Sequence, residues 1–125
     1  LKKIPALNML IKDVQSAAEV NGDIKALDDR RVFVRSTHAA LNCLLQSSGA
    51  IVSKYWIDNL RQHLCEDIKL VGWIHDEVIL EVKEDLADHA KQIVIQAIED
   101  ITDRIGLRVQ LTGDSRIGRN WKEIH

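Results

Sequence analysis

Three ionisable residues, His75, Asp76 and Glu77, stand between two apolar, β-prone runs of the sequence, residues 70–74 and 78–80. A short turn between two strands usually carries Gly or Asn, and neither is present at this break. Two adjacent carboxylates at a hairpin tip form a hard-oxygen site suited to Mg²⁺, which proteins hold with one or two carboxylates plus substrate phosphates. Breaks of local sequence rules tend to mark functional sites. We therefore expect a metal-binding tip with Asp76 and Glu77 as ligands; the alternative is an ordinary polar loop.

A second group of polar residues has the spacing of one helix face. His38, Asn42 and Gln46 are four residues apart, and Gly49 and Ser53 continue the same face. The face carries almost no charge, and its amides can donate hydrogen bonds to a surface rich in acceptors. The DNA minor groove is such a surface, because A·T and T·A pairs present the same acceptors there. The pattern predicts a duplex-contacting face; the alternative is that these amides face water or pack against another polar element.

Three arginines, Arg30, Arg31 and Arg35, come just before this helix. Arginines beside an amide face are suited to hold the phosphate backbone of a duplex whose groove that face contacts. We take Arg35 as a candidate DNA-binding residue. The alternative is a solvated charged surface, which is the usual role of such a cluster.

Length and composition describe one domain of ordinary globular character. The chain has 125 residues, of which 46% are apolar and 29% charged, and its net charge is −2. No apolar run approaches the roughly 20 residues that span a bilayer, so no membrane partner is expected. The slight acidic excess argues mildly against a free-standing nucleic-acid binder, which usually carries a basic excess. The chain begins with Leu rather than Met, which suggests a piece of a longer protein.

The two cysteines, Cys43 and Cys65, indicate the compartment. On one helix they would be separated by about 33 Å along its axis, whereas a disulfide needs Cα atoms within roughly 7 Å. Free thiols of this kind are typical of a reducing, intracellular setting, so we expect a cytoplasmic protein. Their spacing is also unsuited to a zinc site.

Apolar periodicity predicts an α+β fold with a small antiparallel sheet packed against long amphipathic helices. The expected elements, in chain order, are a helix over 6–20, a weak hairpin over 24–34 turning at Asp28-Asp29, a helix over 38–65, a strand pair over 69–74 and 78–82, a helix over 84–104 and a strand starting at 107. In that last segment Leu107, Val109 and Leu111 would share one face. No internal repeat or linker is found.

Taken together, these segments resemble the C-terminal palm portion of the family A (Pol I-like) DNA polymerases, most closely the phage replicative branch. The resemblance rests on "VRSTHAALNCLLQSSGAIVSKYWI", on "GWIHDEVILEV", which is similar to the motif C hairpin of the family, and on the ending "GRNWKEIH". It covers nearly the whole chain. His-Asp-Glu alone is a weak motif, but the combination with the Asn-x₃-Gln helix before it is specific.

The resemblance implies nucleotidyl transfer, in which a primer 3′-hydroxyl attacks the α-phosphate of a dNTP and pyrophosphate leaves. Asp76 would be the motif C carboxylate that binds catalytic Mg²⁺, and Glu77 would support it near the metal or the primer terminus. His75 would contact the primer strand. A two-metal site would be needed, and this chain holds only half of its ligands.

The resemblance also implies partners. Asn42 and Gln46 would reach the minor groove of the nascent duplex, while His38 occupies a position where many relatives carry Arg. The partners would be a primer–template duplex, a dNTP and the remaining polymerase domains.

Parts of the family pattern are missing. The second metal-binding Asp and the fingers helix that binds the incoming dNTP are not found. The aspartates near the start of the chain, Asp23, Asp28 and Asp29, lie in a turn-like, charged context. We therefore expect that the isolated chain does not polymerise. A non-catalytic DNA-binding module, such as a prophage remnant, stays open as an alternative. A small metal-dependent hydrolase is a third; it would need further ligands near the His-Asp-Glu motif, and His63 and His89 have no clear reason to converge there.

Overall fold

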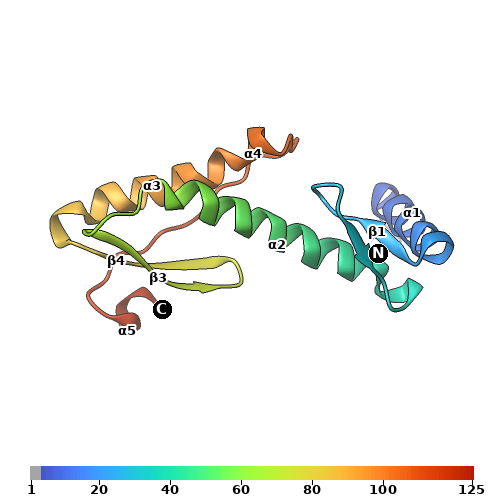
Figure 1. Cartoon of the computed structure of the whole chain (residues 1–125), viewed down its shortest axis with the longest axis horizontal. Coiled ribbons are helices and arrows are strands. Elements are labelled where there is room, and N and C mark those ends of the chain that lie inside the picture. The colour runs from blue at the N-terminus through green and yellow to red at the C-terminus, as the bar shows by residue number, and fades with distance from the viewer. Residues whose placement is uncertain (1–3) are drawn as a thin grey trace. The chain divides into compact units, whose positions relative to one another are not determined.

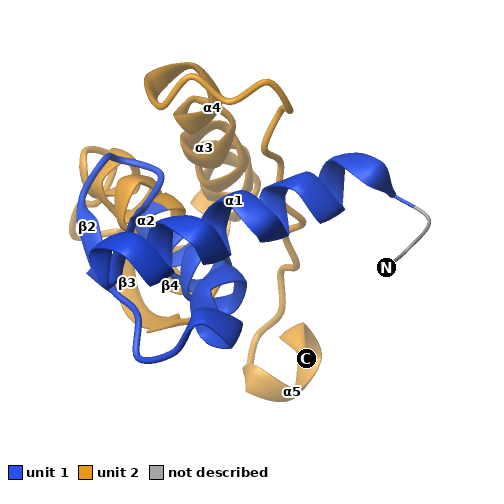
Figure 2. Cartoon of the chain, turned by 90° about the vertical axis from the view of Figure 1, so that its right-hand side faces the viewer, with its two compact units in different colours: residues 1–51 blue, residues 52–125 orange. Residues whose placement is uncertain are grey.

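The computed structural model describes residues 4–125 (Figure 1). Its elements, in chain order, are α1 (Pro5–Asn21), β1 (Asp23–Lys25), β2 (Arg31–Phe33), the 3₁₀ helix η1 (Thr37–Ala39), α2 (Ala40–Arg61), β3 (Ile68–Ile74), β4 (Glu77–Val82), the 3₁₀ helix η2 (Glu84–Leu86), α3 (Ala87–Glu99), α4 (Ile101–Arg104) and α5 (Trp121–Ile124). The predicted α+β class is confirmed. The chain divides into two compact units, residues 1–51 and 52–125 (Figure 2). That they act as one domain stays a prediction.

In the first unit, α1 precedes a short antiparallel hairpin. Pro5 occupies the first turn of α1, where its fixed φ suits the helix. The helix ends at Gly22, whose φ of 73° is left-handed and whose amide donates to the carbonyl of Ala18 at 3.0 Å. β1 then pairs with β2, and the turn between them contains Asp29 with a φ of 63°. The predicted helix and hairpin are thus confirmed.

A small apolar core holds the first unit together. Its buried members come from α1, β1, the segment after β2 and the start of α2: Ala18, Ile24, Val34 and Ala40. Half-buried Val14, Val32, Cys43 and Leu44 pack against them. Val14 and Ala18 of α1 therefore pack in this core, whereas Leu10 of the same helix is 40% exposed.

In the second unit, β3 and β4 form a two-stranded antiparallel sheet. The register runs from Ile68 opposite Val82 to Ile74 opposite Glu77, with one irregularity between Leu70 and Gly72. The predicted strand pair is confirmed to within one residue at each end. The register leaves only residues 75 and 76 to make the turn.

A second apolar core packs this hairpin against helices. The buried residues of this core are Trp56 and Leu60 of α2, Ala97 of α3 and Ile101 of α4. Val78 and Leu80 of β4 pack against them. Two hydrogen bonds reinforce the contact between α2 and α3: Trp56 Nε1 donates to the carbonyl of Val94, and Asn59 Nδ2 donates to the carbonyl of Ala97, each at 3.1 Å.

The prediction of a strand that starts at residue 107 is wrong. Residues 107–120 contain no strand, and the side chain of Val109 is 76% exposed. The backbone of this segment bonds to Thr102 instead: the amide of Leu107 donates to its carbonyl, and the amide of Leu111 donates to its hydroxyl, each at 2.9 Å. Only Leu111 of the expected apolar face packs on the second core. The alternating apolar pattern predicted correctly that Leu111 faces the core. It could not show that this segment has no second strand to pair with.

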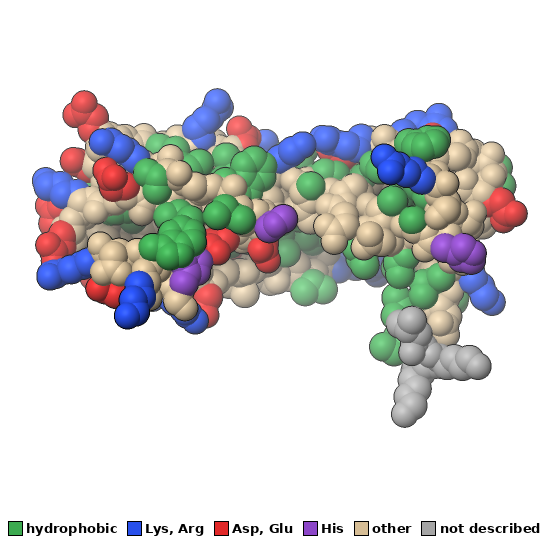
Figure 3. All heavy atoms as spheres, turned by 90° about the horizontal axis from the view of Figure 1, so that it is seen from below, with side chains coloured by type: hydrophobic (Ala, Val, Ile, Leu, Met, Phe, Trp, Pro, Cys, Tyr) green, Lys and Arg blue, Asp and Glu red, His purple; other side chains and the backbone are tan. Residues whose placement is uncertain are grey.

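Large apolar side chains remain at the surface of both units, among charged ones (Figure 3). On β3 these are Val71, Trp73 and Ile74, which are between 45% and 58% exposed. None of the helices formed by the described residues is long and apolar enough to cross a membrane.

Candidate active site

The His-Asp-Glu motif lies at the tip of the β3–β4 hairpin, as the sequence predicts. His75 and Asp76 form a two-residue turn between the paired residues Ile74 and Glu77. His75 has a φ of 54°, whereas Asp76 does not have a positive φ. Among the primed hairpin turns this sign pattern is that of type II′, whose first central position usually holds Gly. A residue other than Gly in this region costs of order 1–3 kcal/mol and persists only where its surroundings hold it.

Two side chains hold the backbone of this turn. The carbonyl of His75 accepts a hydrogen bond from Ser53 Oγ of α2 at 3.2 Å and one from Trp73 Nε1 of β3 at 3.1 Å. Ser53 is buried, with 7% of its surface exposed. Sequence reasoning placed Ser53 on the polar face of the helix but missed its contact with the turn, because nothing in local spacing links the two residues.

The two carboxylates at the tip differ in their surroundings. Asp76 is exposed, and no side chain within residues 4–125 donates a hydrogen bond to it. Glu77 is half-buried, and its Oε1 lies 3.1 Å from Nε2 of His125. This contact was not predictable from the sequence pattern, since the two residues are 48 positions apart in the chain. Asp76 is therefore the more accessible carboxylate.

The donor set fits a partly built Mg²⁺ site. Asp76 and Glu77 supply adjacent hard-oxygen ligands, the chemistry that Mg²⁺ prefers. Within the part of the chain that the structure describes, no group of three or more His, Cys, Asp or Glu side chains is arranged to hold a metal ion. These two carboxylates would therefore need water, substrate phosphates or ligands from elsewhere to complete a coordination sphere.

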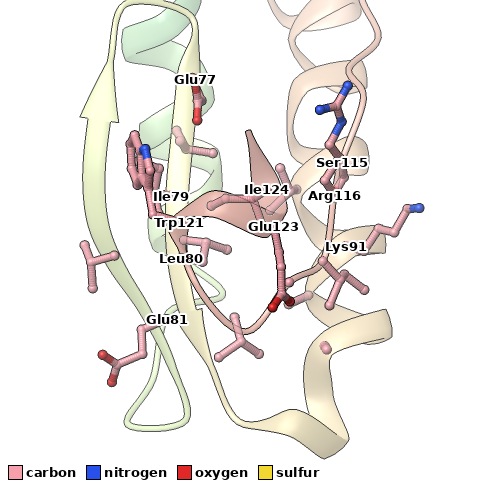
Figure 4. Close-up of a pocket in the computed structure, with 18 of the residues that line it drawn as sticks. Glu77, Ile79, Leu80, Glu81, Lys91, Ser115, Arg116, Trp121, Glu123 and Ile124 are labelled. Atoms are coloured by element: carbon pink, nitrogen blue, oxygen red, sulfur yellow. The ribbon is translucent and has the colours of Figure 1, made fainter.

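A cavity of about 1150 Å³ lies beside the hairpin. Side chains of β4, α3 and α5 line it, including Glu77, Lys91 and Trp121 (Figure 4). Asp76 lines it as well. One wall is formed by residues of the segment 114–125, so the carboxylates and this segment border the same space.

The segment that carries His125 is held by local contacts. The ring of Trp121 lies 4.2 Å from the ring of His125, centroid to centroid. Glu123 accepts hydrogen bonds at the start of α5 from the amide of Arg119 at 2.8 Å and from Asn120 Nδ2 at 2.7 Å. These contacts stabilise a very short helix, which would otherwise be marginal, and they place His125 beside Glu77.

The candidate DNA-binding residues are all exposed. Asn42 and Gln46 lie four residues apart on α2, while His38 lies in η1 and Arg35 precedes it. No hydrogen bond within residues 4–125 engages the amides of Asn42 and Gln46. The side-chain amides of Asn42 and Gln46 are therefore available to a ligand. His38, the first residue of the expected face, lies in the 3₁₀ helix η1 and not in α2.

The histidines that a hydrolase would need lie elsewhere. His63 and His89 line a separate cavity of about 260 Å³ together with Gln92, Ile93 and Gln96. Neither Asp76 nor Glu77 lines that cavity. The arrangement gives no support to a hydrolytic site built on the His-Asp-Glu motif. Both cysteines are free thiols, as the sequence predicts.

Comparisons with known proteins agree with these features. A sequence model described as DNA polymerase family A matches residues 4–123. The DNA-directed DNA polymerase of Enterobacteria phage T3 is 38% identical over 112 residues, and that of Escherichia phage T7 is 36% identical over the same length. Each alignment covers 82% of this chain and 16% of the relative, so the chain spans about a sixth of their length.

A solved structure also matches the fold. The POL domain of Pol1 from M. smegmatis, in complex with DNA primer-template and dNTP, gives a TM-score of 0.71 at 22% identity. The match covers 79% of this chain and 20% of that one. At this identity the likeness concerns the fold alone.

Proposed function

Because this chain belongs to DNA polymerase family A, we propose that it supplies a metal-binding hairpin and a duplex-contacting helix face to a template-directed DNA polymerase. The reaction is nucleotidyl transfer: the primer 3′-hydroxyl attacks the α-phosphate of a dNTP, and pyrophosphate leaves. The chain spans 16% of its phage relatives, so this activity is that of a longer assembly. The remaining polymerase domains, a primer–template duplex and a dNTP are its partners.

Asp76 and Glu77 are the metal ligands of this proposal. Asp76 is the second residue of the turn and Glu77 is the first residue of β4. Asp76 is the freer of the two because Glu77 contacts His125. When bound, a pair of Mg²⁺ ions stabilises the charge that develops on the attacking and leaving oxygens. The two carboxylates lie on a hairpin that packs against α2, α3 and α4. The second metal-binding aspartate comes from outside this chain.

His75 contacts the primer strand. Its side chain is exposed at the first position of the turn, directly before the metal ligands. An imidazole there can donate to a phosphate or sugar oxygen of the primer end, which positions the strand without reading its sequence.

The exposed face of α2 and the segment before it contact the duplex. Asn42 and Gln46 donate to minor-groove acceptors, which are shared by A·T and T·A pairs, so the contact tolerates any correctly paired sequence. Arg35 holds a backbone phosphate, and His38 lies at the edge of the same face. The free thiols Cys43 and Cys65 suit a cytoplasmic setting.

The pair of adjacent carboxylates at the hairpin tip, Asp76 in the two-residue turn and Glu77 at the start of β4, is the observation that carries this proposal. The test is titration of the 125-residue chain with Mn²⁺, followed by paramagnetic broadening of its backbone NMR signals, with and without a primer–template duplex. Broadening should centre on residues 75–77, strengthen with duplex and disappear in Asp76→Asn. The matched control is Glu81→Gln, which removes an exposed carboxylate from the same hairpin. Broadening that survives in Asp76→Asn would contradict the assignment.

A non-catalytic DNA-binding module is the second candidate. It is favoured by the lack of a three-ligand cluster among residues 4–125 and by the unengaged amides of α2. Duplex binding that needs no metal, persists in Asp76→Asn and is lost in Gln46→Ala would support this candidate over the first. In either case we expect no primer extension by the isolated chain.

A further inference from the structure

The hairpin turn adopts a conformation that its own side chains do not explain. His75 has a left-handed φ of 54° at a position where a type II′ turn favours Gly. The imidazole is exposed, and no hydrogen bond within residues 4–125 engages it. The contacts that offset the cost of this positive φ must therefore be made with the backbone of the turn.

Two donors from different elements meet at one backbone oxygen. Ser53 Oγ and Trp73 Nε1 both donate to the carbonyl of His75, at 3.2 Å and 3.1 Å. A carbonyl oxygen has two lone pairs, so these two bonds use its full accepting capacity. One donor comes from α2 and the other from β3, and the oxygen is thus held from two sides.

Ser53 departs from the usual behaviour of a serine within a helix. Such a serine commonly bonds a carbonyl of the preceding turn of its own helix, as Ser47 does with the carbonyl of Leu44 at 3.1 Å. Ser53 instead reaches the hairpin, and it is buried. A buried hydroxyl needs a partner, and this one uses the strained turn.

We propose that Ser53 and Trp73 are positioning residues that clamp the His75 carbonyl and so hold Asp76 and Glu77 in the orientation that takes a divalent cation. The peptide group between His75 and Asp76 is planar, so fixing its oxygen also fixes the direction in which the chain reaches the Cα of Asp76. Mg²⁺ demands near-ideal octahedral geometry, which makes ligand orientation important. The metal part of this inference rests on the proposed function; the clamp on the turn does not.

The clamp can be tested without metal. Ser53→Ala and Trp73→Phe each remove one donor and keep most of the packing volume, and the double variant removes both. We expect amide hydrogen exchange at Glu77, which pairs with Ile74 across the turn, to be about tenfold faster in the double variant and intermediate in the single ones. Ser47→Ala is the matched control, because it removes a helix serine whose bond stays within α2, and it should leave this exchange unchanged.

The second measurement is Mn²⁺ affinity by calorimetry on the same variants. We expect the double variant to bind about tenfold more weakly, while its thermal unfolding midpoint stays close to that of Ser47→Ala. Ser53→Thr keeps the hydroxyl and should restore both exchange and affinity toward the wild type. A purely structural role would instead move the unfolding midpoint together with the affinity.

The outcomes separate the clamp from the metal site. Unchanged exchange at Glu77 in the double variant overturns the clamp, whatever the metal does. Faster exchange in a protein whose wild type binds no Mn²⁺ supports the clamp and contradicts the proposed function. If the double variant unfolds, the single variants carry the test, and equal exchange in both and in the control overturns the inference.

Discussion

Nε2 of His125 lies 3.1 Å from Oε1 of Glu77, so a residue at the end of the chain contacts one of the two carboxylates at the hairpin tip. Both side chains are partly exposed, at 37% and 44%. The contact occupies one oxygen that a metal ion would use if Glu77 is a ligand, as we propose. A bound cation and the imidazole would then compete for the same carboxylate.

Replacing His125 with Ala should strengthen metal binding. An exposed pair of this kind contributes about 0.2–1 kcal/mol, so we expect Mn²⁺ to bind about one and a half to fivefold more tightly. Isothermal calorimetry on the 125-residue chain measures this change. Lys122→Ala, an exposed change on α5, is the control. Weaker binding in His125→Ala would mean that the imidazole supports the site rather than competing for it.

Gly118 lies against Glu123 of α5, the helix directly before His125. A Cβ at this position would lie 2.6 Å from Cβ of Glu123, which is far inside a normal contact. Gly118→Ala should therefore displace α5 and separate the rings of Trp121 and His125. The ring-current shifts of the His125 protons report this separation by NMR.

Gly113→Ala is the matched control for this displacement, because its new methyl group would meet Cγ2 of Ile98 at an ordinary 3.6 Å. The control should keep the wild-type shifts of His125. If Gly118→Ala also keeps them, α5 is able to adjust without losing its place.

The hairpin was predictable from sequence because its pattern is local. Two apolar runs flank a break, and the strands form at those runs with Ile74 and Glu77 as the last pair. This register places Asp76 in the turn and Glu77 at the start of β4, so both carboxylates lie at the tip. The positive φ of His75 was not predicted, since the break lacks the Gly that such a turn favours.

The residues that support the tip were not predictable in this way. Ser53 and His125 meet the turn only through tertiary packing, and their spacing from it carries no periodic signal. The strand expected at 107–111 failed for the same reason: alternation describes which way side chains face, but a strand also needs a partner. The backbone there bonds to Thr102 instead.

The core of the second unit should depend strongly on Ile101. This side chain is fully buried against Trp56, Leu60 and Ala97. Ile101→Ala should lower the free energy of unfolding by about 2–5 kcal/mol, since it removes buried methyl groups and leaves a cavity. Urea denaturation followed by circular dichroism measures the loss.

An exposed change of similar chemistry gives the comparison for that loss. Val109 is 76% exposed, so Val109→Ala should change the free energy of unfolding by no more than about 0.5 kcal/mol. Equal losses in Ile101→Ala and Val109→Ala would show that residues 107–111 form part of the core after all.

Asp28 gives the first hairpin a dependence on pH. Arg30 Nε donates to both carboxylate oxygens of Asp28, at 2.9 Å and 2.7 Å, and this hydrogen bonding lowers the pKa of Asp28 below its ordinary 3.8. A lowered folded pKa means that the carboxylate stabilises the fold fully above the unfolded value. The contribution is lost as the pH falls through the folded value.

Titration of the Asp28 carboxyl carbon by NMR tests this sign. Arg30→Gln should raise the pKa of Asp28 toward its ordinary value, because the hydrogen bonding that lowers it is removed. Arg31→Gln, which removes an arginine paired with Asp23 instead, should leave the titration of Asp28 unchanged. A titration of Asp28 that is the same in all three proteins would contradict the assigned cause.

Arg35 and Gln46 should weaken duplex binding in different ways. Arg35 is assigned to a phosphate, so Arg35→Ala should reduce the slope of log affinity against log salt by about 0.9, the value expected for one phosphate contact on B-DNA. Gln46 is assigned to base edges in the minor groove. Gln46→Ala should reduce affinity about two- to tenfold at every salt concentration, which corresponds to one hydrogen bond of about 0.5–1.5 kcal/mol. Fluorescence anisotropy with a labelled primer–template duplex measures both quantities.

The two variants control for each other because both side chains are exposed and neither substitution disturbs a core. A reduced slope in Arg35→Ala with an unchanged slope in Gln46→Ala would separate the phosphate contact of Arg35 from the groove contact of Gln46 on α2. An unchanged slope in Arg35→Ala would remove that residue from the interface. An unchanged affinity in Gln46→Ala would mean that the side-chain amide of Gln46 faces water and does not contact the duplex.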